Sequence, residues 1–153
     1  MSDINEIKVW MVAIMERLRG LPYVQSVISG ASVSLASWLD LSVPPTLLVM
    51  LEGEDWEDKG RIGYASHEGP VVFGIYMKIE DVDAAVGEAP LDLLDVRQDV
   101  QDKLLGFIPD GAGVKGILKL HNGGWIAQDA SSVVYRLAFR VRTILSQKED
   151  VNV

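Results

Sequence analysis

The sequence predicts an α+β fold: a single domain with a mainly antiparallel sheet and two helices packed on one face. Apolar residues recur at helical spacing over 3–19 and 90–105, and they alternate at strand spacing over 69–79 and 132–145. The predicted strands follow one another in runs and do not alternate with helices, which is typical of α+β folds. A chain of 153 residues is long enough for one domain with a sizeable core.

The first helix is expected over residues 3–19. Asp3 and Glu6 resemble a capping box at its start, and Gly20 followed by Pro22 ends it. Its apolar stripe is Ile4, Ile7, Met11, Ile14 and Leu18. A short strand is expected over 23–28. Residues 31–42 fit either one or two helical turns or an irregular packed loop.

Strands are expected next. The apolar run 45–51 predicts a buried strand, and the acidic segment 52–60 predicts a solvated hairpin tip. A partner strand begins at 61–66, and 69–79 continues with alternating faces. One face carries Val71, Phe73, Ile75, Met77 and Ile79, and the other carries Val72, Gly74, Tyr76 and Lys78. Residues 80–89 are expected to form an acidic turn region.

The second helix is expected over 90–105, with proline at its first position and Gly106 after its end. Its apolar stripe is Leu93, Val96, Val100 and Leu104. A strand is expected at about 116–121, followed by a turn at Asn122-Gly123-Gly124. The last strand, 132–145, buries Val133, Tyr135, Leu137, Phe139 and Val141. The domain is expected to span 1–147, with a polar tail over 148–153.

No motif supports catalysis, a cofactor or a metal site. The G-x-G-x-x-G pattern at 111–116 follows a helix and precedes a strand, which reverses the order that nucleotide binding needs. The acidic segment fails the calcium-loop pattern because Lys59 occupies a ligand position. The chain has no cysteine, and His67 and His121 are expected in surface turns. We therefore expect no enzyme, no cofactor and no bound metal.

The charge balance argues against nucleic acid as a partner. The net charge is −8, and phosphate contacts need clustered Lys and Arg. The uncharged stretch 20–39 has the length of a membrane span, but it holds a proline and five serines, so no membrane contact is expected. The acidic N-terminus lacks the basic start of a signal peptide, and a soluble intracellular protein is expected.

Two charged sets are candidates for an interface. The acidic set lies at spacings of three and four on one face of the second helix: Asp92, Asp95, Asp99 and Asp102. The basic set shares one face of the last strand: Arg136, Arg140 and Arg142. Each set is either a solvated face or a contact with another subunit, and the two could also pair within one subunit. Residues 1–110 carry a net charge of −11 and residues 111–147 carry +4, which favours contact between subunits.

The order of these elements resembles the tail terminator (tail completion) proteins of Mu-like phages and prophages, over nearly the whole chain. The matching features are the helix over Ile4–Leu18, the Pro44-Pro45 pair before an apolar strand, a strand ending near Glu80-Asp81-Val82, the second helix leading into Gly106-Phe107-Ile108-Pro109, and Tyr135-x-x-x-Phe139 in the closing strand.

The resemblance implies a structural virion protein without catalysis. Such subunits form a ring, expected here to be a hexamer, that caps the head-proximal end of the tail tube and ends its polymerisation. The implied partners are further copies of the chain, the tail tube protein and a neck or head-completion protein. The implied location is the host cytoplasm during assembly and then the virion tail. The alternatives are another phage neck or baseplate adaptor, or a small ligand-binding or enzymatic α+β domain.

Overall fold

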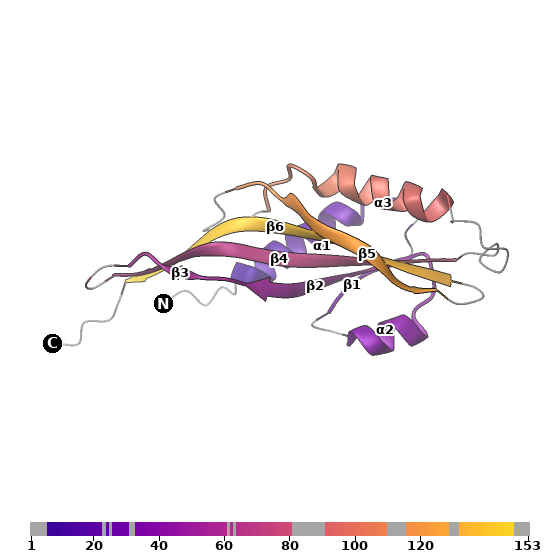
Figure 1. Ribbon diagram of the computed structural model, residues 1–153, viewed down its shortest axis with the longest axis horizontal. Helices are drawn as coiled ribbons and strands as arrows, with labels where there is room; N and C mark the ends of the chain where they lie inside the picture. The colour runs from indigo at the N-terminus through magenta and orange to yellow at the C-terminus, as the bar shows by residue number, and fades with distance from the viewer. Residues whose placement is uncertain are drawn as a thin grey trace.

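The computed structural model describes residues 6–22, 24, 26–30, 33–60, 62, 64–80, 91–109, 116–128 and 132–148. The elements in order are α1 (Glu6–Leu18), β1 (Ser26–Ser29), α2 (Leu35–Leu41), β2 (Thr46–Glu54), β3 (Glu57–Asp58), β4 (Tyr64–Glu80), α3 (Leu91–Leu104), β5 (Lys119–Gln128) and β6 (Ser132–Lys148). Helices α1 and α3 lie on one side of an elongated sheet and α2 lies on the other (Figure 1). The α+β prediction is confirmed.

The sheet has six strands in the order β1-β2-β4-β6-β5, with β3 paired to β4. Strands β1 and β2 are parallel, and every other pair is antiparallel. The two long strands, β4 and β6, pair along their whole length from Tyr64↔Lys148 to Glu80↔Ser132. This central ladder joins the middle of the chain to its end and sets the register of the strands on both sides.

The main core lies between the sheet and the α1–α3 pair. Met11, Ile14 and Leu18 of the predicted α1 stripe are buried, with Trp10 beside them. The predicted stripe of α3 and the inward residues of β4 are all buried, and so are those of β6 apart from Tyr135, which is partly buried against the same core. Each fully buried large side chain contributes about 1.5–3 kcal/mol, so this layer supplies most of the hydrophobic stabilisation.

A smaller core on the opposite side of the sheet holds α2. Trp38 packs there with Leu48, Tyr76 and Val134. The Nζ of the buried Lys78 donates to the backbone oxygens of Leu39 and Ser42, at 2.8 and 3.1 Å, at the C-terminal end of α2. A cation is favourable at that end of a helix. Residues 35–41 form this helix, so the helical interpretation of 31–42 is the correct one of the two.

The predicted turn at Asn122-Gly123-Gly124 is wrong, because these residues lie inside β5. They pair with Ala138, Leu137 and Arg136 of β6. A Cβ on Gly123 would lie 3.0 Å from the oxygen of Arg136, so a glycine permits the close approach of the two strands. Long-range pairing with β6 overrides the local turn preference.

Two other expectations need correction. Glu52 lies within β2 and not in an acidic connection, because β2 continues through a bulge between Leu51 and Gly53. His67 and His121 are exposed as expected, but they lie in β4 and β5 and not in turns.

The ends of the predicted elements agree only in part. Gly106 has φ +83° and ends α3 as predicted, while β6 runs three residues beyond its predicted end. Asp3, Ile4, residues 81–90, residues 110–115 and the tail after 148 lie outside the described residues. No helix in the described part of the chain is long and apolar enough to cross a membrane.

Candidate interaction surface

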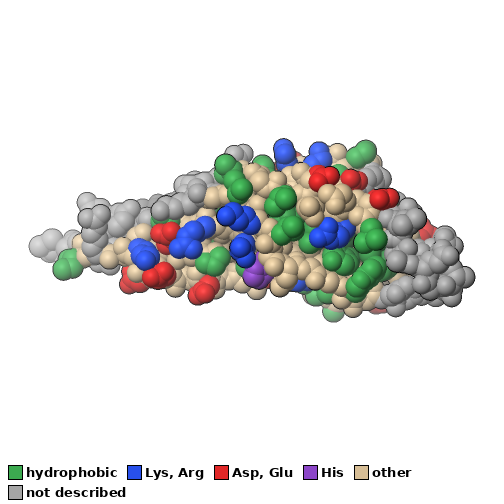
Figure 2. Space-filling view, turned by 45° about the horizontal axis from the view of Figure 1, so that its top comes forward, with side chains coloured by type: hydrophobic (Ala, Val, Ile, Leu, Met, Phe, Trp, Pro, Cys, Tyr) green, Lys and Arg blue, Asp and Glu red, His purple; other side chains and the backbone are tan. Residues whose placement is uncertain are grey.

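Among the elements that the structure describes, α2 covers one end of its side of the sheet. Beyond α2 this side presents polar and charged side chains, which we call the open face: Glu52 of β2, Lys119 and Asn122 of β5, and Arg136, Arg140 and Arg142 of β6. The strand period puts the three arginines on this side because the alternate residues of β6 fill the main core. Figure 2 shows Lys and Arg side chains along the length of the molecule, with Asp and Glu side chains gathered near the left end and again at the upper right.

Arg136 is the centre of a polar network that crosses four strands. Its Nε lies 2.9 and 2.8 Å from the two carboxylate oxygens of Glu52, and its Nη2 donates to Oε1 at 2.5 Å. Its Nη1 donates to Oδ1 of Asn122 at 2.6 Å. The hydroxyl of Tyr76 donates to Oε2 of Glu52 at 2.6 Å. Charge-assisted bonds of this kind are the stronger ones in proteins, so the network ties β2, β4, β6 and β5 together.

The network shifts the titration of its members. Burial by itself would raise the pKa of Glu52, but hydrogen bonds from Arg136 and Tyr76 and the charge of Arg136 hold it below its usual value. Burial and the hydrogen bond to the Glu52 carboxylate raise the pKa of Tyr76 to about 12. The hydrogen bond to Glu52 raises the pKa of Arg136. At neutral pH the carboxylate is therefore charged and the phenol is protonated.

Gly74 leaves the space that the Glu52 carboxylate occupies. A Cβ built on Gly74 would lie 2.4 Å from the carboxylate carbon of Glu52. The glycine pairs with Met50 on one side and Ala138 on the other, so it sits in the middle of the sheet. The absence of a side chain at this position allows Glu52 to reach across β4 to Arg136.

The three predicted interface arginines differ in their surroundings. Arg136 is bound to Glu52, and the two side chains are 20 % and 17 % exposed. Arg142 donates to Glu68 of β4 at 2.8 Å, with 54 % of its own side chain exposed. Arg140 is exposed and has no acidic partner among the residues that the structure describes. Arg140 is therefore the arginine of this set that remains available to another molecule.

The acidic set on α3 lies on the other side of the sheet. Asp95 and Asp102 are exposed, Asp99 is half-exposed, and the side chain of Asp92 lies outside the described residues. Asp102 accepts a hydrogen bond from Nε2 of Gln98 at 2.9 Å. The sheet separates Asp95, Asp99 and Asp102 from the arginines, which excludes pairing between these residues within one chain.

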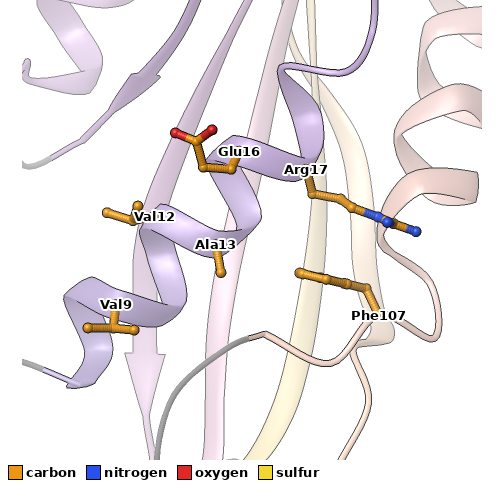
Figure 3. Close-up of a pocket in the computed structure, with 6 residues that line it drawn as sticks. All are labelled: Val9, Val12, Ala13, Glu16, Arg17 and Phe107. Atoms are coloured by element: carbon orange, nitrogen blue, oxygen red, sulfur yellow. The ribbon is translucent and has the colours of Figure 1, made fainter.

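A shallow groove of about 450 Å³ lies between α1 and the segment after α3. It is lined by Val9, Val12, Ala13, Glu16, Arg17 and Phe107. The guanidinium of Arg17 lies over the ring of Phe107, with its central carbon 5.0 Å from the ring centre (Figure 3). No group of three or more His, Asp or Glu side chains in the described residues is placed to hold a metal ion.

Sequence reasoning missed Glu52 and Asn122 as partners of Arg136, and Tyr76 as a partner of Glu52. Two local signals were present: a carboxylate directly after an apolar strand, and a glycine in the middle of the alternating strand 69–79. Neither signal identifies the partner, because Glu52 and Arg136 are 84 residues apart.

The fold is similar to that of a chain in a solved virion structure, although the sequences differ. No protein-family model matches the sequence, and no curated protein matches it. Among solved structures, a chain of the "Virion of native gene transfer agent (GTA) particle" matches with a TM-score of 0.55 and 19 % sequence identity. The match covers 94 % of this chain and 100 % of that chain. At this identity the likeness concerns the fold, and it extends over both chains almost completely.

Proposed function

We propose that this chain is a structural component of a phage-like virion, and that it is the tail terminator. In this role it forms a ring, a hexamer, on the head-proximal end of the tail tube. The ring stops tube polymerisation and offers a surface to the neck. The observation that carries the proposal is the likeness in fold to a virion chain, which covers 94 % of this chain and 100 % of that chain. The sequence resemblance to Mu-like tail terminators supports the finer assignment.

The partners in this proposal are further copies of the chain, the tail tube protein and a neck or head-completion protein. The charged surfaces fit such contacts because charge complementarity fixes register and speeds encounter. Arg140, with Arg136 and Arg142 beside it, is proposed to face acidic residues of the next subunit. Since the sheet separates the arginines from Asp95, Asp99 and Asp102, a contact between these residues requires two molecules.

The proposed role needs no catalysis, cofactor or metal. The polar network around Arg136 satisfies its own charges and ties the strands of one subunit together. A ring subunit needs a rigid sheet of this kind because small changes in strand geometry would alter the angle between neighbouring subunits.

The test is tube growth in the presence of the purified chain. Tail tube protein from the same virion is allowed to polymerise with and without it, and tube lengths are measured by negative-stain electron microscopy. We expect shorter tubes with a ring at one end. The variant Glu52→Gln with Arg136→Met, which disrupts the sheet network, is expected to shorten the tubes less than the unchanged chain does. Binding to a neck or baseplate protein without any effect on tube length would indicate the adaptor function instead.

A further inference from the structure

The sheet ends in two strands that each pair on one side only. Among the described strands, β5 pairs with β6 alone, and β1 pairs with β2 alone. Terminal strands present backbone N–H and C=O groups along their outer edge, which is a template for pairing with another chain. The two terminal strands run antiparallel to each other, because β5 follows the direction of β4 and β1 follows that of β2.

The two edges lie at the same height along the strands. One row of paired residues crosses all five strands of the main path: Gly124, Arg136, Tyr76, Leu48 and Ile28. A second copy placed beside the first without any slip along the strands would therefore set its Ile28 opposite Gly124. Bulges on either side leave residues 122–125 as a regular stretch of β5, and β1 is also four residues long.

Further along the strands, the charges on the two sides of the sheet are complementary. A second row runs from Lys119 through Arg140 and Val72 to Gly53. Lys119 and Arg140 are exposed at the β5 side of this row. At the other side Gly53 is followed by four exposed acidic residues: Glu54, Asp55, Glu57 and Asp58. The same unslipped arrangement would bring the basic end of one edge beside the acidic end of the other.

Apolar surface is also exposed on the β5 edge. Trp125 is 52 % exposed and Ile126 is 41 % exposed, whereas Trp10 and Trp38 are fully buried. Trp125 rests edge-on against Tyr135, with ring centres 5.5 Å apart. Exposed aromatic side chains are enriched in protein interfaces, and apolar contacts contribute more to the binding free energy than surface ion pairs do.

We propose that β5 of one copy pairs antiparallel with β1 of the next copy, so that one sheet continues from subunit to subunit around the ring. Lys119 and Arg140 then face the acidic segment 54–58 of the neighbour, and Trp125 is covered. This contact uses two different surfaces, so it can close a ring when the rotation between subunits suits. The inference rests on the proposed ring function and adds its interface.

Disulfide trapping tests the contact directly. Because the chain contains no cysteine, any cross-link must form between the introduced cysteines. One variant carries Gly124→Cys, where a Cβ meets nothing within 4 Å, and the other carries Ile28→Cys. Directly opposed residues of antiparallel strands lie about 4.5–5.5 Å apart between Cα atoms, which a disulfide spans. The two full-length chains are mixed at a concentration where light scattering shows an oligomer, and they are then mildly oxidised.

We expect a covalent dimer in the mixture and no more than a trace in either chain alone. A chain carrying both substitutions should give a ladder that stops at the ring size. The comparison mixture is Arg140→Cys with Asp95→Cys, which reports contact with the α3 face. An oligomer without the Gly124–Ile28 cross-link, or with the Arg140–Asp95 cross-link instead, would overturn the edge contact and leave the ring intact. A monomer at every concentration would overturn both the ring and this interface.

Discussion

Arg136 holds Glu52 across the width of β4, although the two residues are 84 positions apart in the sequence. Both carboxylate oxygens accept from the guanidinium, and the pair is mostly covered, with side chains 20 % and 17 % exposed. A surface ion pair contributes about 0–1 kcal/mol, but a covered, bidentate pair contributes more because water screens it less. This contact joins β2 to β6 on the open face, at a place that none of the described helices covers.

A double-mutant cycle on this pair should show strong coupling. We expect Glu52→Gln and Arg136→Met each to lower the free energy of unfolding by about 2 kcal/mol, and the double variant to lose clearly less than the sum. The measurement is urea unfolding followed by circular dichroism. Arg142→Met is the matched control, since 54 % of that side chain is exposed, and it should cost about 0–1 kcal/mol. Additive losses at Glu52 and Arg136 would contradict the coupling.

The same cycle has a defined pH dependence. The folded state lowers the pKa of Glu52 from its usual 4.5, so the carboxylate stabilises the fold above that pH. The stabilisation is lost as the pH falls through the lower, folded-state value. The difference in stability between wild type and Glu52→Gln should therefore shrink in acid, and a constant difference would count against the charged pair.

Two glycine substitutions in the sheet should differ in cost. In Gly74→Ala the new Cβ would lie 2.4 Å from the Glu52 carboxylate, which must move away from Arg136, and we expect a loss of about 2 kcal/mol. In Gly124→Ala the Cβ meets nothing within 4 Å, so the stability should change by less than about 0.5 kcal/mol. Thermal unfolding of both variants gives the comparison. Equal effects would mean that Gly74 is not needed for the reach of Glu52.

Tyr76 should lose its phenolic proton at an unusually high pH. Its pKa is raised from 10.0 to about 12 by burial and by the Glu52 carboxylate. Since the folded state binds this proton more tightly, the stabilisation is complete below pH 10 and is lost as the pH rises through about 12. An absorbance titration of the phenolates should show one late phase that Tyr76→Phe removes. Circular dichroism at each pH confirms that the chain is still folded, and the absence of a late phase that depends on Tyr76 would refute the shift.

The local pattern of the sequence predicts the main core well. Helical spacing identifies the buried stripe of α3, and strand alternation identifies the inward residues of β4 and β6. Burial on one face is a local property, because it depends only on the period of the element itself. The same period correctly places Arg136, Arg140 and Arg142 on one face of β6.

The rest depends on pairing between distant segments. Asn122-Gly123-Gly124 has the composition of a turn, but β6 offers a partner strand long enough to extend β5 through it. Glu52 belongs to an acidic run by composition, and it lies in β2 only because β2 continues to pair with β4 past a bulge at this residue. Register and bulges are set by the partner strand, so the polar network on the open face was not predictable from the neighbouring residues.

The charges of the proposed ring contact can be exchanged between its two sides. We expect Lys119→Glu with Arg140→Glu to weaken self-association at low salt by about tenfold, which corresponds to about 1.4 kcal/mol and fits two exposed pairs. Most of the effect should vanish near 1 M salt, where the Debye screening length is only about 3 Å.

Adding Glu54→Lys and Asp55→Lys should restore part of the association if the acidic segment after β2 is the partner. The matched comparison adds Asp95→Lys and Asp99→Lys instead, and it should restore nothing unless the α3 face is the partner. Light scattering at equal protein concentration measures all three. Unchanged association in Lys119→Glu with Arg140→Glu would remove both residues from the interface.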